Sequence, residues 1–337
     1  MPISHLPRVT LAHAPTPLEV MSNLSTMLDG PNLYVKRDDC TGLAMGGNKT
    51  RQLEYYFGEA LQQSADTVII TGAVQSNFVR QAAAAARKLG MDCEIQLEHR
   101  VAIKGLDYET SGNVLLDRLL GAKIHTYTDG DDEAGADAAL EEIADNVAIR
   151  GGKPYVIHLS PGHPPLGALG YVDAAFELLD QAAERGITID AVVLGSGSAA
   201  THAGFLSGVR YRKDPLKVVG VCVRRGADHQ ASRVFKHCQD VEKLANFLST
   251  VTEEDVIVLD DYLGVGYGHS TPEMMEAIAL AGRTEGLLLD PVYTGKVLAG
   301  LIGLVRDGTF VAGENVVFLH TGGTPALFGY RSLFDDM

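Results

Sequence analysis

The sequence predicts an α/β protein whose mostly parallel sheets are flanked by helices. Short apolar runs rich in Val, Ile and Leu alternate along the chain with segments of helical spacing. Strands that are apolar throughout are typical of parallel sheets buried on both faces. At 337 residues, with 46% hydrophobic residues, the chain can bury a large core and is expected to form two domains.

The apolar runs that we interpret as strands are spread over the whole chain. Helical segments at 82–89, which is rich in alanine, and at 113–120 lie between runs of the first half. This alternation favours parallel strands joined by crossover helices. The predicted strands are 33–35, 67–70, 94–97, 123–127, 155–158, 191–194, 218–221, 256–258 and 316–319.

Charge and composition exclude several kinds of partner. The formal net charge of -15 argues against nucleic acid and anionic membranes, because a phosphate surface needs a basic face. We find no apolar segment long enough to cross a bilayer and no signal peptide at the N-terminus. We therefore expect a soluble, cytoplasmic protein with a small-molecule substrate.

The cysteines do not indicate a metal site. Cys40, Cys93, Cys222 and Cys238 form no C-x-x-C pair and have no matching histidine spacing. Reduced thiols are the simpler interpretation. We predict neither a bound metal nor a disulfide framework.

The stretch 36–51 carries the first chemical signal. A β-prone run at 33–35 leads into a loop that ends in Gly46-Gly47, and Asn48 is a plausible N-cap for the helix that follows. Lys49 then lies in the first helical turn, where the helix dipole disfavours a cation. This position lowers the pKa of an amine, as a lysine that attacks a carbonyl requires. A solvated lysine is the alternative for this motif taken alone.

A glycine-rich loop between a predicted strand and a helix suits an anion. Its small residues allow backbone N–H groups to close around a phosphate at the helix N-terminus, and Ser198 and Thr201 add hydroxyl donors. The same letters satisfy G-x-G-x-x-A, and Arg224-Arg225 ends the next strand, so an NADP-dependent oxidoreductase is an alternative. The loop comprises Gly195, Ser196, Gly197, Ser198, Ala199, Ala200 and Thr201.

Several ordered motifs together resemble one enzyme family. They are Lys36-Arg-Asp-Asp, Gly46-Gly-Asn-Lys-Thr-Arg, Gln75-Ser-Asn, Asp290-Pro-Val-Tyr-Thr-Gly-Lys and His320-Thr-Gly-Gly. In this order they resemble the D-cysteine desulfhydrase and 1-aminocyclopropane-1-carboxylate (ACC) deaminase family over nearly the whole chain. The resemblance implies a fold-type II pyridoxal 5'-phosphate (PLP) enzyme. It also implies a smaller domain at 47–164, a larger PLP-binding domain from 1–46 plus 165–337, and a homodimer.

The resemblance assigns the cofactor-binding residues. It implies that Lys49 binds PLP covalently, that Asn77 contacts the ring hydroxyl and that Thr321 contacts the pyridine nitrogen. The loop residues Gly197, Ser198, Ala199, Ala200 and Thr201 are expected to hold the phosphate. Lys49, Ser76 and Tyr293 are the expected catalytic residues.

The substrate-binding residues depart from the family pattern at several positions. Phe78 stands where the family usually has histidine, and Thr294 stands where ACC deaminases carry glutamate. The loop 160–165 also differs, and we expect Ser160, the Gly162 N–H and His163 to recognise an anionic group of the substrate. Tyr267 is a candidate second active-site tyrosine. The expected substrate contacts are Ser76, Asn77, Phe78, His163, Tyr267 and Thr294.

The predicted activity is that of a PLP-dependent carbon–sulfur lyase acting on an amino acid. Elimination would release sulfide from D-cysteine or sulfite from L-cysteate, together with pyruvate and ammonia. ACC deaminase is the nearest catalytic alternative and is disfavoured by Thr294. A PLP-binding protein without turnover and the NADP-dependent oxidoreductase are the alternatives of other classes.

Overall fold

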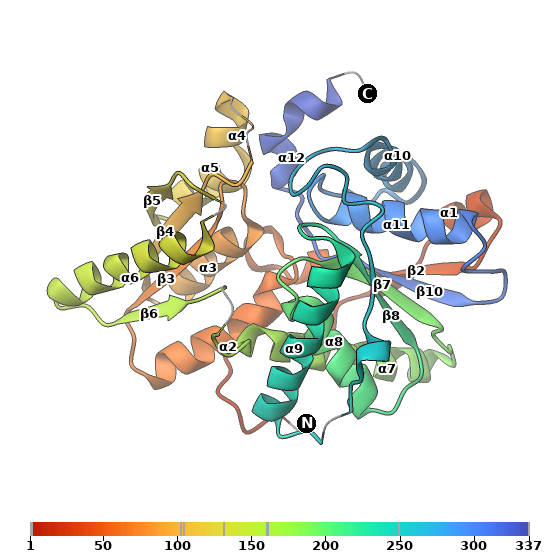
Figure 1. Ribbon diagram of the computed structural model, residues 1–337, viewed down its shortest axis with the longest axis horizontal. Coiled ribbons are helices and arrows are strands. Elements are labelled where there is room, and N and C mark those ends of the chain that lie inside the picture. The colour runs from red at the N-terminus through yellow and green to blue at the C-terminus, as the bar shows by residue number, and fades with distance from the viewer. Residues whose placement is uncertain are drawn as a thin grey trace. The chain divides into compact units, whose positions relative to one another are not determined.

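The computed structural model (Figure 1) describes residues 3–101, 103, 105–130, 132–159, 162–248 and 250–335. The chain divides into two compact units. The first comprises Met1–Ala12, Gly42–His163 and Pro325–Met337, and the second comprises His13–Thr41 and Pro164–Thr324. Each unit contains a sheet flanked by helices, which confirms the predicted α/β class.

The sheet of the first unit has the strand order β5-β4-β3-β6, and its neighbouring strands are parallel. Every residue of the central strand β3 is buried, as expected for a parallel strand covered on both faces. The four strands are β3 (Thr67–Ala73), β4 (Asp92–Glu98), β5 (Lys123–Tyr127) and β6 (Pro154–Ile157).

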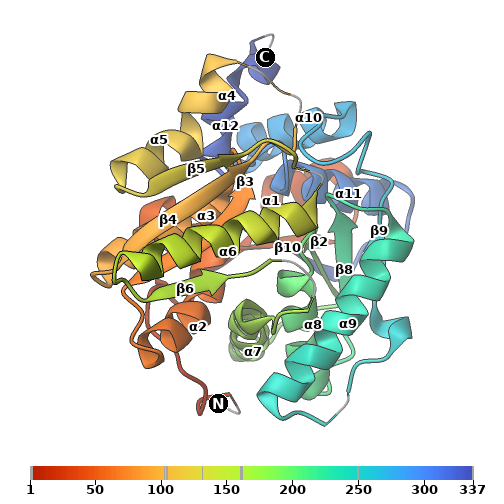
Figure 2. The ribbon, with the colours of Figure 1, turned by 60° about the vertical axis from the view of Figure 1, so that its left-hand side comes forward.

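Helices cover both faces of this sheet. On one face α6 (Glu133–Ile149) packs Leu140 and Val147 against Ile69 of β3. On the other face the alanine-rich α3 (Asn77–Lys88) packs on β3 and β4, and α2 (Lys49–Gln62) packs on α3. Figure 2 shows α6 in front of the sheet. The short helices α4 (Leu106–Thr110), α5 (Gly112–Leu119) and α12 (Ala326–Gly329) complete the unit.

The sheet of the second unit has the order β1-β2-β10-β7-β8-β9. All its neighbouring strands are parallel except the edge strand β1, which is antiparallel to β2. The strands are β1 (Leu18–Val20), β2 (Asn32–Lys36), β7 (Ala191–Ser196), β8 (Lys217–Cys222), β9 (Ile257–Leu259) and β10 (Asn315–Leu319).

Alternate residues of each strand face the two helical layers of this unit. Val192 and Leu194 belong to the core beneath α7, α8 and α9, whereas Val193 belongs to the core beneath α1, α10 and α11. The period of two therefore explains why β7 is apolar at consecutive positions from Ala191 to Leu194. The helices, drawn in Figure 1, are α1 (Ser22–Leu28), α7 (Leu169–Arg185), α8 (Ala200–Tyr211), α9 (Ala227–Ala245), α10 (Pro272–Leu280) and α11 (Thr294–Arg306).

Both ends of the chain pack within the first unit. The buried carboxylate of Glu54 on α2 accepts hydrogen bonds from the backbone N–H groups of Leu11 and Ala12, each at 2.8 Å. At the other end, Tyr330 packs edge-on against Tyr108, with the ring centroids 5.3 Å apart. The domain limits 47–164 and 1–46 plus 165–337 stay a prediction, and the two units differ from them at the chain ends.

Among the described helices, none combines the length and the apolar character that a membrane span needs.

Candidate active site

Lys49 is the first residue of α2, and Asn48 stands at the N-cap, as the sequence predicts. The preceding loop turns through Gly46 and Gly47, whose φ angles of 66° and 125° favour glycine. Lys49 is half-buried, and its Nζ lies 3.3 Å from Gln52 Oε1 and 5.0 Å from the centroid of the Phe78 ring. Loss of solvent around Nζ lowers the pKa of Lys49 to about 8. This amine reaches its neutral, nucleophilic form far more readily than an exposed lysine.

Arg80 connects the Lys49 loop to the turn before α3. Its buried guanidinium donates to the carbonyl of Gly46 at 2.8 Å and to Oδ1 of Asn77 at 3.0 Å. It also donates to Oδ1 of Asn113 at 2.7 Å. The sequence analysis assigned Arg80 no role, because an arginine on an amphipathic helix reads as a solvent-exposed residue.

Ser76 and Asn77 begin α3. Ser76 is its N-cap, and its hydroxyl accepts a hydrogen bond from the N–H of Val79 at 3.3 Å, the capping role that this residue type commonly has. Asn77 Oδ1 accepts from Arg80 and, at 3.1 Å, from Asn113 Nδ2. These contacts fix the amide of Asn77. The contacts of Ser76 and Asn77 with cofactor and substrate stay predictions.

In the second unit, the glycine-rich loop leads from β7 into the N-terminus of α8. Ala199 adopts a left-handed conformation with φ of 77°, which turns the chain sharply before the first residue of the helix. Any Cβ at Gly197 would lie 3.0 Å from Val223, so glycine lets the strand ends pack closely. The N-terminal N–H groups and the dipole of a twelve-residue helix favour an anion at this loop. Gly197 and Ser198 lie in the loop, and Ala200 and Thr201 are the first two residues of α8.

Asp290 organises the turn that carries Tyr293. The fully buried carboxylate accepts from the N–H groups of Val292, Tyr293 and Thr294, each at 2.9 Å, and from the Thr294 hydroxyl at 2.7 Å. Thr294 is itself fully buried, so its hydroxyl has a structural partner. The contact of Thr294 with a substrate stays a prediction. Thr321 follows the C-terminal end of β10, at the carboxyl edge of this unit's sheet.

Tyr293 and Tyr267 form a hydrogen-bonded pair. Their hydroxyl oxygens lie 2.6 Å apart, and the rings meet edge to face with their centroids 5.9 Å apart. The loop that carries Tyr267 is held by Lys296 on α11, whose fully buried Nζ donates to the carbonyls of Leu263 and Gly266. Sequence reasoning noted Tyr267 and Tyr293 but assigned no role to Lys296, because its partners are backbone atoms about thirty residues away.

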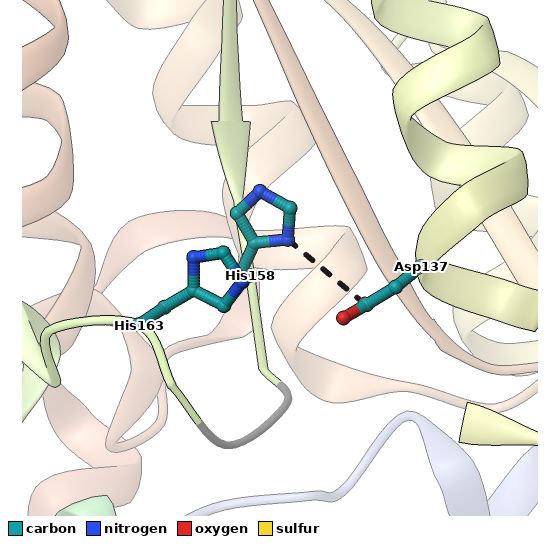
Figure 3. A group of neighbouring side chains, drawn as sticks. All are labelled: Asp137, His158 and His163. Carbon is teal, nitrogen blue, oxygen red and sulfur yellow. Dashed lines mark ion pairs between the residues drawn. The ribbon is translucent and has the colours of Figure 1, made fainter. Parts of the chain in front are cut away.

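His163, predicted to contact the substrate, stacks on His158 in the structure. The two imidazole rings are 10° from parallel, and their centroids are 3.7 Å apart (Figure 3). Asp137 on α6 faces the same pair. The substrate role of His163 stays a prediction, and Ser160, named with it, lies outside the described residues.

Each unit contains side chains or backbone groups of the kind that a PLP enzyme needs. The first unit offers a lysine amine with a lowered pKa, and the second offers an anion-binding helix N-terminus with a tyrosine pair. This fold and these sites define a fold-type II, PLP-dependent enzyme. Residues 9–322 match the family described as pyridoxal-phosphate dependent enzymes, and the chain belongs to that family. The match removes the NADP-dependent alternative for the glycine-rich loop.

Relatives of known name agree with this assignment. The chain is 43% identical over 334 residues to proteins named D-cysteine desulfhydrase from Salmonella choleraesuis (strain SC-B67) and Salmonella paratyphi C (strain RKS4594). The alignments cover 98% of this chain and 99% of each relative.

A solved structure described as an ACC deaminase homologue is 37% identical and superposes with a TM-score of 0.88, covering 98% of this chain and 96% of that one. A hydrogen sulfide-producing enzyme from Fusobacterium nucleatum shares the fold at 15% identity, with a TM-score of 0.65 and coverage of 92% of this chain and 95% of that one.

Proposed function

We propose that the protein is a carbon–sulfur lyase that converts D-cysteine and water into pyruvate, ammonia and hydrogen sulfide. The observation that carries this proposal is the near-complete, 43% identical alignment with D-cysteine desulfhydrases, combined with a half-buried Lys49 whose pKa is lowered to about 8. PLP, when bound, supplies the electron sink that stabilises negative charge at the substrate Cα.

The cofactor-binding residues are those that the resemblance indicates. Lys49 would hold the cofactor covalently, Asn77 would contact its ring hydroxyl and Thr321 its ring nitrogen. The N–H groups and hydroxyls of Gly197, Ser198, Ala199, Ala200 and Thr201 bind the phosphate. The position of this loop at the N-terminus of α8 supports the phosphate assignment.

Proton transfer is assigned to two groups. Lys49 Nζ removes the Cα proton, a role that suits an amine whose pKa lies near neutral pH. Tyr293 moves or holds a proton at its hydroxyl, which lies 2.6 Å from the hydroxyl of Tyr267 and forms a hydrogen bond with it. Ser76 assists at the substrate carboxylate.

L-cysteate is the second candidate substrate, with sulfite as its leaving group. Phe78 and the loop 160–165 keep this candidate open, because both differ from the pattern that the desulfhydrase resemblance leads us to expect. ACC deamination is less well supported. The position of the ACC deaminase glutamate is occupied by Thr294, whose hydroxyl is bonded to Asp290.

A substrate panel tests the proposal. Purified protein loaded with PLP is incubated with D-cysteine, L-cysteine, L-cysteate and ACC, and the keto acid, sulfide and sulfite are measured. We expect pyruvate and sulfide in equal amounts from D-cysteine and no turnover by Lys49→Ala. Pyruvate with sulfite from L-cysteate alone would favour the second candidate, and 2-oxobutyrate from ACC would replace both. His163→Ala tests the predicted substrate contact through KM.

We further propose that the enzyme is a cytoplasmic homodimer. Both statements rest on the family resemblance. Light scattering of the purified protein tests the dimer, since a mass near 36 kDa would be that of a single chain.

A further inference from the structure

The two residues that flank the phosphate-binding segment 197–201 are hydrogen-bonded to each other. Ser196 is the last residue of β7 and directly precedes Gly197, and His202 directly follows Thr201 in the first turn of α8. Ser196 Oγ lies 3.1 Å from His202 Nδ1. This single hydrogen bond therefore joins the two ends of the segment.

Gln230 fixes the direction of that hydrogen bond. It lies on α9, which packs along α8 (Figure 1), and its Nε2 donates to Ser196 Oγ at 2.8 Å. The serine oxygen accepts there, so its one proton is available to His202 Nδ1, and the neutral ring carries its own proton on Nε2. Loss of solvent lowers the pKa of His202 to about 4. The imidazole is therefore neutral near pH 7, and its Nδ1 is an acceptor.

The neighbouring strand β8 leaves room for the His202 ring. A Cβ at Gly220 would lie 2.4 Å from Nδ1 and 2.5 Å from Cε1 of His202, so only glycine leaves the ring in this place. Ser196, His202 and Gln230 are all fully buried. Since a buried polar group that loses its partner pays the full cost of desolvation, this network favours one arrangement of the segment ends.

Two arginines bind carbonyl groups of the same segment. Arg225 Nη1 donates to the carbonyl of Gly197 at 3.4 Å, and Arg233 Nε on α9 donates to that of Ser198 at 3.3 Å. In a trans peptide the C=O and the N–H point in opposite directions. The N–H groups of Ser198 and Ala199 therefore point away from the guanidinium groups. The sequence analysis considered Arg225 for a 2′-phosphate, whereas the structure shows it on a carbonyl of this segment.

We propose that His202 is a positioning residue for the cofactor phosphate and acts through its hydrogen bond to Ser196. Because His202 is fully buried, it acts on the segment rather than by contact with the phosphate. The hydrogen bond holds the two ends of 197–201 at one spacing, which orients the N–H groups between them. Donors that are already oriented bind more tightly, because the segment loses little conformational entropy on binding. The inference rests on the phosphate assignment proposed above and is independent of the substrate.

Binding of PLP and of pyridoxal, which lacks the phosphate, to the full-length, cofactor-free protein tests the proposal. Both ligands have the same ring and aldehyde, so the ratio of their Kd values, measured by fluorescence titration, isolates the phosphate. His202→Leu should raise Kd for PLP about tenfold, the equivalent of one buried hydrogen bond, and should leave Kd for pyridoxal nearly unchanged. Ser196→Ala should have the same effect. Ser207→Ala, a fully buried serine on α8, is the matched control and should keep the wild-type ratio.

His202→Asn separates the hydrogen bond from packing. Asn Oδ1 can replace Nδ1 as the acceptor, whereas Leu is closer to histidine in volume but cannot accept. His202→Asn should therefore keep more of the preference for PLP than His202→Leu does. The reverse order would overturn the proposal, because it would mean that the ring only fills space.

Two further outcomes distinguish this inference from the phosphate assignment. A wild type that binds pyridoxal as tightly as PLP would remove the phosphate assignment and this inference with it. A wild type that prefers PLP, with the same preference in His202→Leu and Ser196→Ala, would overturn the role of His202 alone. Should His202→Leu fail to fold, Ser196→Ala decides the question, since it removes the same hydrogen bond by deleting one oxygen atom.

Discussion

The hydroxyl oxygens of Tyr267 and Tyr293 lie 2.6 Å apart, and each tyrosine is held by a different buried charged residue. Asp290 accepts the N–H of Tyr293, and Lys296 donates to the carbonyls on either side of the segment that leads into Tyr267. The backbone of each tyrosine is therefore fixed independently of the hydrogen bond between the hydroxyls. Removing either hydroxyl should change proton transfer without displacing the other ring.

Tyr293→Phe should reduce kcat with little change in KM. A positioned acid or base typically contributes about 10²-fold or more to the rate, so a loss of that order is expected.

Tyr267→Phe should have a smaller effect on kcat and should shift the pH profile, because Tyr293 then loses its hydroxyl partner. Steady-state kinetics across pH measure both. Tyr211→Phe is the matched control, since Tyr211, the last residue of α8, stacks on Phe247 outside the tyrosine pair, and its substitution should leave the kinetics unchanged. Equal losses in the two active-site variants would contradict the assignment of Tyr293 as the proton-transfer group.

Lys296→Met should weaken activity through the position of Tyr267. The substitution removes the Nζ ammonium group, which lies 2.7 Å from the carbonyl oxygen of Leu263 and 3.0 Å from that of Gly266. Both carbonyl oxygens then lack this donor. Unsatisfied buried acceptors cost about 1–3 kcal/mol each, so the free energy of unfolding should also fall. Because the methionine leaves space near two carbonyls, added ammonium chloride should restore part of kcat.

The ammonium effect separates positioning from simple destabilisation. Sodium chloride at the same ionic strength is the control salt, and Lys236→Met, an exposed lysine on α9, is the control variant. Rescue by both salts, or by neither, would mean that Lys296 serves stability alone.

The fold could be predicted because several of its strands contain runs of consecutive apolar residues, as at 68–70, 191–194 and 316–319. Val192 and Val193 face opposite helical layers. Because both faces of such a strand are buried, consecutive residues are apolar, and this run of apolar residues identifies the strand in the sequence. The edge strand β1 was missed because it has only three residues and two of them are exposed. Lys49 was placed correctly at the helix start, since Gly-Gly-Asn is a local signal.

The supporting side chains could not be predicted from local patterns. Arg80 and Lys296 have partners that lie about thirty residues away or more, and those partners include backbone carbonyls, which carry no sequence signal. The pairing of His158 with Asp137 depends on the end of β6 and the rotation of α6. Such contacts follow from tertiary register, which a single sequence does not specify.

The lowered pKa of Lys49 predicts how cofactor loading depends on pH. Only the neutral amine attacks the PLP aldehyde, so the rate of covalent attachment to the cofactor-free protein should rise with pH around a midpoint near 8. Between pH 7 and 8 the neutral fraction rises about fivefold. Borohydride trapping followed by mass spectrometry measures the rate. A midpoint above 10, as for an exposed lysine, would show that burial does not control this amine.

Asp117 on α5 predicts a second pH effect, on stability. Burial raises the pKa of its carboxyl to about 8, although the nearby Arg80 guanidinium opposes the shift. Neither carboxyl oxygen has a hydrogen-bond partner among the residues that the structure describes. The folded state therefore binds more protons than the unfolded chain between pH 3.8 and about 8. Asp117 should lower the free energy of unfolding as the pH rises through that range.

Asp117→Asn should remove this dependence and stabilise the protein near pH 8. A gain of about 1–3 kcal/mol is expected there, and almost none near pH 4, where the native carboxyl is already neutral. Urea unfolding at several pH values measures the difference between the two proteins. Asp145→Asn, an exposed carboxylate on α6, should change stability by less than about 0.5 kcal/mol at every pH. Asp117→Asn could instead destabilise the protein, most strongly at pH 8. That result would mean that the carboxyl is ionised at this pH and stabilises the Arg80 cation, because the substitution then removes a charge that Arg80 needs.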